Sequence, residues 1–209
     1  LYPIFADHMP GALWGNMYTF KEAARAHSMG LDSLIGIPMR VAGSLLIGFL
    51  VYGIILAETG GGKFFINIAE SLMGKYRGGP AKVAILASGF FGMLSGSPTS
   101  NVITSGSLTI PAMKKAGYSG RYAAAIEACA STGGVLMPPV MGTVAFIMAS
   151  FLNLPYAEIL LAALIPGAIF YIALIIQTDL YAAKNKLLGM NAKDIPQLYP
   201  TLINGFPFI

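Results

Sequence analysis

Two long stretches without a charged residue dominate the pattern of hydrophobic and polar positions along this chain. No Asp, Glu, Lys or Arg occurs over residues 83–113, and none occurs over residues 128–157. Each stretch exceeds the roughly 18 apolar residues that indicate a membrane-spanning helix. The largely apolar segments 35–57 and 159–183 also have the length of spanning helices. The pattern therefore predicts an all-α integral membrane protein.

The stretch 83–113 is too long for a single crossing. At about 1.5 Å per residue, one helix of this length would exceed a hydrocarbon core that is roughly 30 Å thick. Its apolar arm, 83–94, covers about 18 Å and leads into a polar centre that reads Ser95-Gly96-Ser97-Pro98-Thr99-Ser100-Asn101. We therefore predict a re-entrant helical hairpin over 80–116, which turns at this centre. A single spanning helix whose hydroxyl groups face its neighbours is the alternative.

The segment 119–152 contains residues that typically end one helix and start the next. Thr132-Gly133-Gly134 interrupts a helical pattern, and Pro138-Pro139 follows before an apolar pattern resumes. Glycine is typical of a helix end and proline of a helix start. Backbone groups left unpaired at membrane depth are tolerated only where they are buried in protein or line a cavity. We predict a broken, discontinuous helix here, with a merely kinked helix as the alternative.

The rest of the pattern completes the domain organisation. Residues 1–34 are mixed in polarity and are predicted to be a polar or interfacial lead-in to a membrane module at 35–183. The amphipathic pattern of 63–76 predicts an interfacial helix or a helix packed on the bundle. Residues 184–209 are predicted to be a cytoplasmic tail or connector. Because the chain opens at Leu1 without an initiating Met, we expect it to be a piece of a longer membrane protein.

Composition and charge exclude several classes of protein. Charged residues make up 11% of the 209 residues, against about 25% in soluble domains. The net charge of +4 comes without a basic cluster interleaved with aromatic residues, so nucleic acid is not an expected partner. The single cysteine, Cys129, excludes an internal disulfide framework. Because no phosphate-binding loop, HExxH or GxSxG motif occurs, we predict that the chain is not an enzyme.

The polar centre of the predicted hairpin has the chemistry of an ion-binding site. Ser97 suits a helix N-cap and Pro98 the first helical position, so free N–H groups there would face a carboxylate or a phosphate. Carbonyl groups near Ser95 and Gly96, and those over residues 134–139, suit a cation. Because these oxygens are neutral, they favour Na⁺ over Ca²⁺. Paired broken helices with an ion at their ends are typical of secondary transporters.

Glu127 is a further candidate, because ionisable groups inside membrane segments are functional candidates by default. It lies six residues beyond Arg121. We therefore expect Glu127 either to couple a proton to transport or to pair with a cation near the membrane surface.

Four motifs follow one another in the order found in a known family of transporters. They are Gly89-Phe90-Phe91-Gly92-Met93-Leu94-Ser95-Gly96-Ser97, Ile110-Pro111-Ala112-Met113-Lys114-Lys115-Ala116-Gly117-Tyr118, Gly134-Val135-Leu136-Met137-Pro138-Pro139 and Ala163-Leu164-Ile165-Pro166-Gly167. On these motifs the chain resembles the large membrane subunit of tripartite ATP-independent periplasmic (TRAP) transporters, most closely the fused-permease type. The resemblance covers about 35–183 and places the chain in the first half of that subunit.

The resemblance implies a multi-pass protein of the bacterial inner membrane that works as an elevator-type, ion-driven importer of an organic acid. A periplasmic substrate-binding protein would deliver the acid, and the remainder of the same permease chain would complete the transporter within the lipid bilayer. The residues that the resemblance nominates for Na⁺ are Ser95, Gly96, Ser97, Gly134, Met137 and Pro139. The residues that we predict to contact the substrate are Ser97, Thr99, Ser100 and Asn101.

Two departures from the family pattern stand at these positions. Val140 follows the two prolines where the family usually has a serine, and the small residues that commonly follow the hairpin tip are replaced by Pro98-Thr99-Ser100-Asn101. Two alternative functions therefore stay open. One is a proton-coupled, hairpin-bearing symporter that works through Glu127, and the other is a non-transporting structural membrane subunit.

Overall fold

A computed structural model describes residues 2–30 and 47–205, together with residues 33, 35, 36, 39, 40 and 43. The described residues form helices and no strand, which confirms the prediction of an all-helical chain. The predicted span 35–57 lies in part outside the described residues. Its described end is α4 (Ile47–Leu56), which continues through the π-helical turn η4 (Ala57–Gly61).

The first residues form short helical elements. These are α1 (Tyr2–Phe5), η1 (Ala6–His8), η2 (Gly11–Leu13) and α2 (Phe20–Met29). Helix α2 begins with a capping box, in which the Thr19 hydroxyl accepts from the Glu22 N–H while the Glu22 carboxylate accepts from the Thr19 N–H. These reciprocal bonds satisfy two of the donors that every helix start leaves open.

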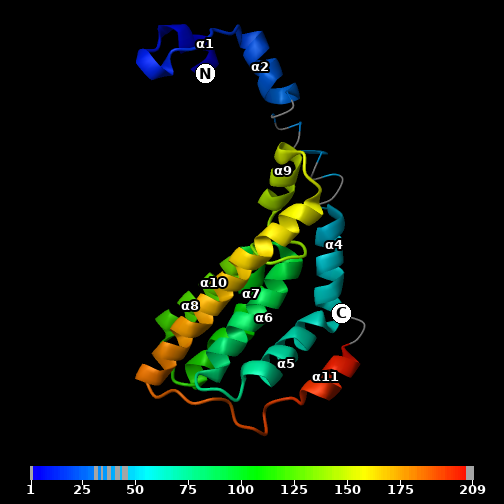
Figure 1. Ribbon diagram of the computed structural model, residues 1–209, viewed down its shortest axis with the longest axis vertical. Coiled ribbons are helices and arrows are strands. Elements are labelled where there is room, and N and C mark those ends of the chain that lie inside the picture. Colours follow the sequence, from blue (N-terminus) through cyan, green and yellow to red (C-terminus); the bar gives the residue numbers. More distant parts are fainter. Residues whose placement is uncertain are drawn as a thin grey trace.

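Three helices form the centre of the molecule (Figure 1). Helices α6 (Gly79–Ser95) and α7 (Pro98–Lys115) run antiparallel as one hairpin, and α8 (Gly120–Gly134) packs against both. Small residues let the backbones approach closely, since Ala81, Ala84, Ala123 and Ala130 are all fully buried. Small residues at helix contacts are typical of packing inside membranes, where apolar area alone does not drive association.

Helix α10 (Tyr156–Lys184) is the one described helix that is both long and apolar enough to cross a membrane. It has 29 residues, about 43 Å at 1.5 Å per residue. One side of it packs on α6 and α8. The other side presents large apolar side chains, of which Leu161, Ile165, Ile169 and Leu180 are each more than 60% exposed. Such a face suits lipid or further helices rather than water.

Two further helices flank this centre on the side of α6 (Figure 1). Helix α5 (Gly62–Met73) packs along α6 through a buried cluster of Ala69, Val83 and Ala87. The last described helix, α11 (Leu198–Asn204), lies against α5, and the Ser71 hydroxyl donates to the Pro196 carbonyl at 2.8 Å. The segment 184–205 therefore folds back onto the helices that precede it.

An ion-pair group ties the last turns of α10 to the first turn of α6. The Asp179 carboxylate accepts from the Arg77 guanidinium, with Nε at 3.0 Å from each oxygen, and from the Lys82 ammonium at 2.5 Å. Beside it, the rings of Tyr118, Tyr122 and Tyr181 stack. Burial raises the pKa of Tyr118 to about 12, so its phenol stays protonated and donates to the Gly78 carbonyl at 3.3 Å. These contacts fix the register of α10 along the hairpin.

Candidate functional site at the hairpin tip

The hairpin turns within three residues. Helix α6 ends at Gly96, whose φ of +57° closes the helix in the left-handed conformation. Ser97 then caps α7, with its hydroxyl 3.4 Å from the Ser100 N–H and Pro98 at the first helical position. The sequence favours this turn because glycine adopts a positive φ at no steric cost, whereas the serine and the proline each suit a helix start.

The tip rests on the segment that joins α8 to α9 (Thr143–Leu152), residues 135–142, which we call the α8–α9 connection. The Val140 N–H donates to the Met93 carbonyl at 3.0 Å. The backbones of α6 and α8 touch just below, since a Cβ added to Gly92 would lie 2.3 Å from the Gly134 Cα. The hairpin tip and the α8–α9 connection are therefore one packed unit.

The α8–α9 connection is held in an irregular conformation by hydrogen bonds at both ends. It contains a cis peptide bond between Pro138 and Pro139, and its ends close on each other as the Gly142 N–H donates to the Val135 carbonyl at 2.9 Å. From α10, the Tyr156 hydroxyl lies 2.8 Å from the Pro139 carbonyl and 2.7 Å from the Val140 carbonyl. One phenol thus fixes the connection to the start of α10.

A Tyr156→Phe substitution is expected to destabilise this junction by about 1 kcal/mol, the usual net value of an intramolecular hydrogen bond. The variant ring can keep its stacking on Phe146, where the centroids are 4.4 Å apart, so the loss reports on the hydroxyl. Thermal unfolding of the complete permease in detergent would measure it. Tyr199→Phe is the matched control, because Tyr199 is 76% exposed and should change nothing. Equal melting temperatures for both variants would contradict the expectation.

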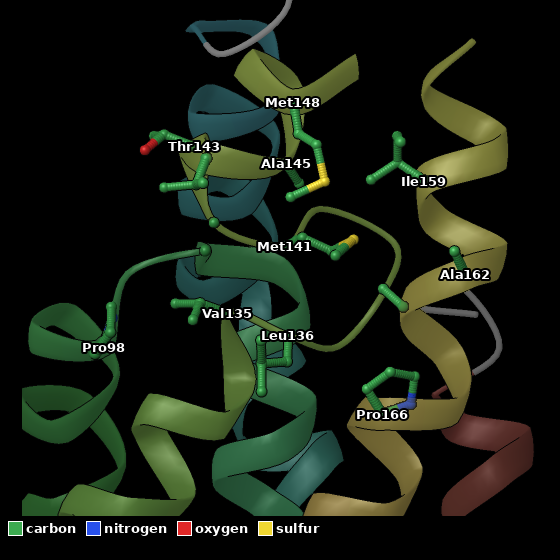
Figure 2. Close-up of a pocket in the computed structure, with 14 residues that line it drawn as sticks. Pro98, Val135, Leu136, Met141, Thr143, Ala145, Met148, Ile159, Ala162 and Pro166 are labelled. Carbon is green, nitrogen blue, oxygen red and sulfur yellow. The ribbon is translucent and has the colours of Figure 1, made fainter. Parts of the chain in front are cut away.

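Four helix ends meet at this place, the carboxyl ends of α6 and α8 and the amino ends of α7 and α9. Beside them lies a cavity of ≈640 Å³ between α9, α10 and the tip. Figure 2 shows Met141, Met148 and Ile159 around this space, with Pro98 at its hairpin side. The lining is mainly apolar, and its few polar groups come from the helix ends. This combination is typical of a small-molecule site.

The six residues nominated for Na⁺ lie at the tip, at the last residue of α8 and in the α8–α9 connection. Ser95, Gly96 and Ser97 are half-buried, and the Ser95 hydroxyl has only long contacts, at 3.4 Å, with Ser97. The Gly134 carbonyl accepts from the Met137 N–H at 3.2 Å, and the Pro139 carbonyl accepts from Tyr156. The structure therefore places neutral oxygens from both segments in one region. Among the residues it describes, it shows no acidic or histidine metal cluster.

The residues predicted to contact substrate differ in their surroundings. Thr99 and Ser100 are exposed on the first turn of α7, next to the half-buried Ser97. Asn101 is 1% exposed, and its amide nitrogen donates to the Ser88 carbonyl at 2.7 Å. Its side chain therefore joins the two arms of the hairpin.

Glu127 lies deeper, where both hairpin arms meet α8. Its side chain is fully buried, and the structure shows no ion pair to it from Arg121 or from any other described cation. Hydroxyl groups surround it instead, from Ser88, Ser105, Thr109 and Ser131. The expected pairing with a surface cation is therefore wrong.

Sequence reasoning did not find these hydroxyl partners. A signal was present, because Asn101, Ser105 and Thr109 recur every four residues and so share one face of α7. No sequence pattern indicated that Asp179 pairs with Lys82 and Arg77, since these residues lie 97 and 102 positions away along the chain.

The described part of the chain thus combines one helix that is long and apolar enough to cross a bilayer with four other helix ends gathered beside a cavity. The family model described as "Tripartite ATP-independent periplasmic transporter, DctM component" matches residues 5–209. The chain belongs to this family, which confirms the resemblance seen in the sequence. The family is described as a transporter component, and the relatives below are named as transporter permeases and not as enzymes.

Three curated relatives illustrate the family. The C4-dicarboxylate TRAP transporter large permease protein DctM of Vibrio cholerae is 35% identical over 133 residues, which cover 63% of this chain and 29% of that protein. The ectoine/5-hydroxyectoine TRAP transporter large permease protein UehC of Ruegeria pomeroyi is 28% identical over 88% of this chain and 42% of its own length. The sialic acid TRAP transporter permease protein SiaT of Haemophilus influenzae is 35% identical over 62% of this chain and 21% of its own length. The chain thus spans less than half the length of these relatives.

Proposed function

We propose that this chain is the part of a multi-pass inner-membrane permease that binds the coupling ion and the substrate during secondary active import of an organic acid. The observation that carries the proposal is the convergence of four helix ends beside a cavity. Helix ends at one place offer partial positive and partial negative charges without any ionised side chain. Transporters use such ends to bind ions and charged substrates at membrane depth.

The position of the tip along α10 supports a re-entrant hairpin. The start of α6 pairs with the end of α10 through Lys82 and Asp179, whereas the tip reaches the level of Pro166, which lines the cavity with Gly96. Pro166 lies ten residues from Tyr156, the amino end of α10, which is about 15 Å at 1.5 Å per residue. A bilayer that α10 crosses would therefore contain the tip within its depth. If α10 crosses the bilayer in this way, α8 and α9 are the two halves of one broken helix.

Sodium is the coupling ion that the oxygens at the tip favour. The available ligands are the Ser95 and Ser97 hydroxyls and backbone carbonyls of the tip and of residues 134–139. These are hard, neutral oxygens, which suit Na⁺ better than a divalent ion that recruits carboxylates. The weakly engaged Ser95 hydroxyl is the most available of them.

The substrate is proposed to be a carboxylate held at the start of α7. The exposed Thr99 and Ser100, with Ser97 beside them, offer hydroxyls at the start of α7, and the Thr99 N–H belongs to the first turn, where a helix leaves its donors open. Asn101 would support these residues by holding the arms of the hairpin together. The relatives' names give a C4-dicarboxylate and sialic acid as substrates, which agrees with an acid in this position.

The remaining partners follow from the family. A periplasmic binding protein would deliver the acid, and the rest of the permease would complete the site and frame the exposed face of α10 together with lipid. Because the tip and the α8–α9 connection are one packed unit, they would move together. Such joint movement agrees with an elevator-type mechanism.

Thiol labelling in the complete permease tests the sodium site without knowledge of the substrate. Cys129 is exposed, so it is first replaced by alanine, and a Ser100→Cys substitution then supplies a single thiol at the tip. We expect Na⁺, but not K⁺, to slow labelling several-fold. Ser107→Cys, on an exposed position of the same helix about 10 Å further on, is the control. Equal labelling of Ser100→Cys in both salts would refute the sodium site.

A further inference from the structure

Glu127 is a buried carboxyl group that the proposed transport chemistry at the tip does not use. Its side chain is 0% exposed, and it lies about 10 Å along α8 from Gly134, seven residues away. The ion pairs shown for the described part of the chain involve Asp7 and Asp179, not Glu127. A buried carboxylate without a cation is unfavourable. The negative charge of the Glu127 carboxylate must therefore be neutralised by something other than a cationic side chain.

Its surroundings are hydroxyl groups from three helices. Oε1 lies 2.7 Å from the Ser88 hydroxyl of α6 and 3.3 Å from the Ser131 hydroxyl of α8, and it also contacts the Ser105 hydroxyl of α7. Oε2 lies 2.5 Å from the Thr109 hydroxyl of α7. The hydroxyls of Ser88 and Ser105 are themselves 3.1 Å apart. Among the described residues, no group of three or more acidic, histidine or cysteine side chains that could bind a metal ion includes Glu127.

The hydrogen-bond partners around Glu127 can accommodate one proton on its carboxyl group. A protonated Oε2 donates to Thr109, whose own hydroxyl then donates to the Ser105 carbonyl at 3.0 Å. Oε1 meanwhile accepts from the serine hydroxyls, and no polar atom of this group lacks a partner. When the proton leaves, the Thr109 hydroxyl turns from the Ser105 carbonyl to Oε2. A single hydroxyl rotation thus accommodates both states.

We propose that Glu127 is a proton-binding site inside the core of α6, α7 and α8, with Thr109 as the acceptor of its proton. On α10, Tyr171 interacts electrostatically with Glu127, and its hydroxyl donates to the Ala130 carbonyl at 2.7 Å. Helices α6 and α7 face it with hydroxyls and with the amide of Asn101. Among the described residues, no Lys, Arg or His forms an ion pair with Glu127.

The bound proton keeps both arms of the hairpin on α8. Loss of the proton leaves a charge between three helices, which favours separation of the hairpin from α8 and access of water to the carboxylate. Deprotonation of Glu127 therefore loosens the attachment of the hairpin to α8. This inference concerns Glu127 alone and does not depend on sodium binding at the tip.

Infrared spectroscopy of the complete permease in bilayers tests the proposal, in K⁺ buffer and without substrate. We expect a carbonyl band of a protonated carboxylic acid, and Glu127→Gln should abolish it. Thr109→Val should shift the band, because it removes the acceptor of the proton. Thr104→Val is the matched control, since Thr104 is exposed and bonds only the Ser100 carbonyl of its own helix at 2.9 Å.

The proposal is overturned if the acid bands of Glu127→Gln and of the parent protein coincide at every pH at which both are folded. Should Glu127→Gln fail to fold, the two threonine variants decide the matter. A shift in Thr109→Val alone supports the proton site, and identical spectra of Thr109→Val and Thr104→Val reject it.

Discussion

A Gly96→Ala substitution in the complete permease is expected to lower the melting temperature strongly and to remove the sodium effect at the hairpin tip. Gly96 has a φ of +57°, and an L side chain in this conformation costs about 1–2 kcal/mol. A Cβ there would also lie 2.1 Å from the Met141 carbonyl oxygen. Because a backbone atom cannot rotate away, the tip and the α8–α9 connection would have to separate. Thermal unfolding and thiol labelling would measure the two effects.

Two control glycines separate the causes. Gly11 has a φ of +60° with no atom within 4 Å of an added Cβ, so Gly11→Ala pays the backbone cost alone. Gly120 begins α8, and its nearest atom is the flexible end of Lys114 at 3.9 Å, so Gly120→Ala should be harmless. We expect the loss to grow from Gly120→Ala through Gly11→Ala to Gly96→Ala. If Gly11→Ala and Gly96→Ala lowered the melting temperature equally, the contact of the added Cβ with Met141 would not contribute to the loss of stability.

An Asp179→Asn substitution is expected to have the second large effect, because it leaves the ammonium of Lys82 buried without its carboxylate. The Lys82 side chain is 7% exposed and Asp179 is 25% exposed. Removing one partner of a buried pair costs about 3–5 kcal/mol, and the partial exposure of Asp179 places this pair near the lower end. The melting temperature and the yield of folded permease would both fall.

The ion-pair group offers its own controls. Arg77→Gln removes a partner that is 56% exposed, so its effect should be small beside that of Asp179→Asn. The double variant Lys82→Met with Asp179→Leu removes both charges and should recover most of the lost stability. A double variant as unstable as Asp179→Asn would show that the charge left on Lys82 is not the cause.

The sequence predicted those features that depend on local chemistry. Glycine, serine and proline at residues 96–98 close one helix and open the next whatever surrounds them, and the helices α6 and α7 indeed meet there. The same holds for the interruption after Gly134, where α8 ends. A buried glutamate could be inferred as well, because its segment is apolar.

Features that join distant parts of the chain could not be predicted in this way. The pairing of Asp179 with Lys82, and the contact of Ser71 with Pro196, depend on how α10 and the last residues fold back. Glu127 combines both kinds of feature: its burial follows from the local sequence, whereas its partners depend on how distant helices pack. Its position suggested a partner, but Arg121 and the hydroxyls of two other helices were equally available until the packing was known.

The four helix ends at the tip have a consequence for how charge is bound there. Two amino ends carry partial positive charge and two carboxyl ends carry partial negative charge, so the contributions nearly cancel over the junction as a whole. Such an arrangement favours a cation and an anion bound side by side over either one alone, because each neutralises the field that the other leaves. Sodium and a carboxylate would then raise each other's affinity by the same factor, as linkage between two sites requires.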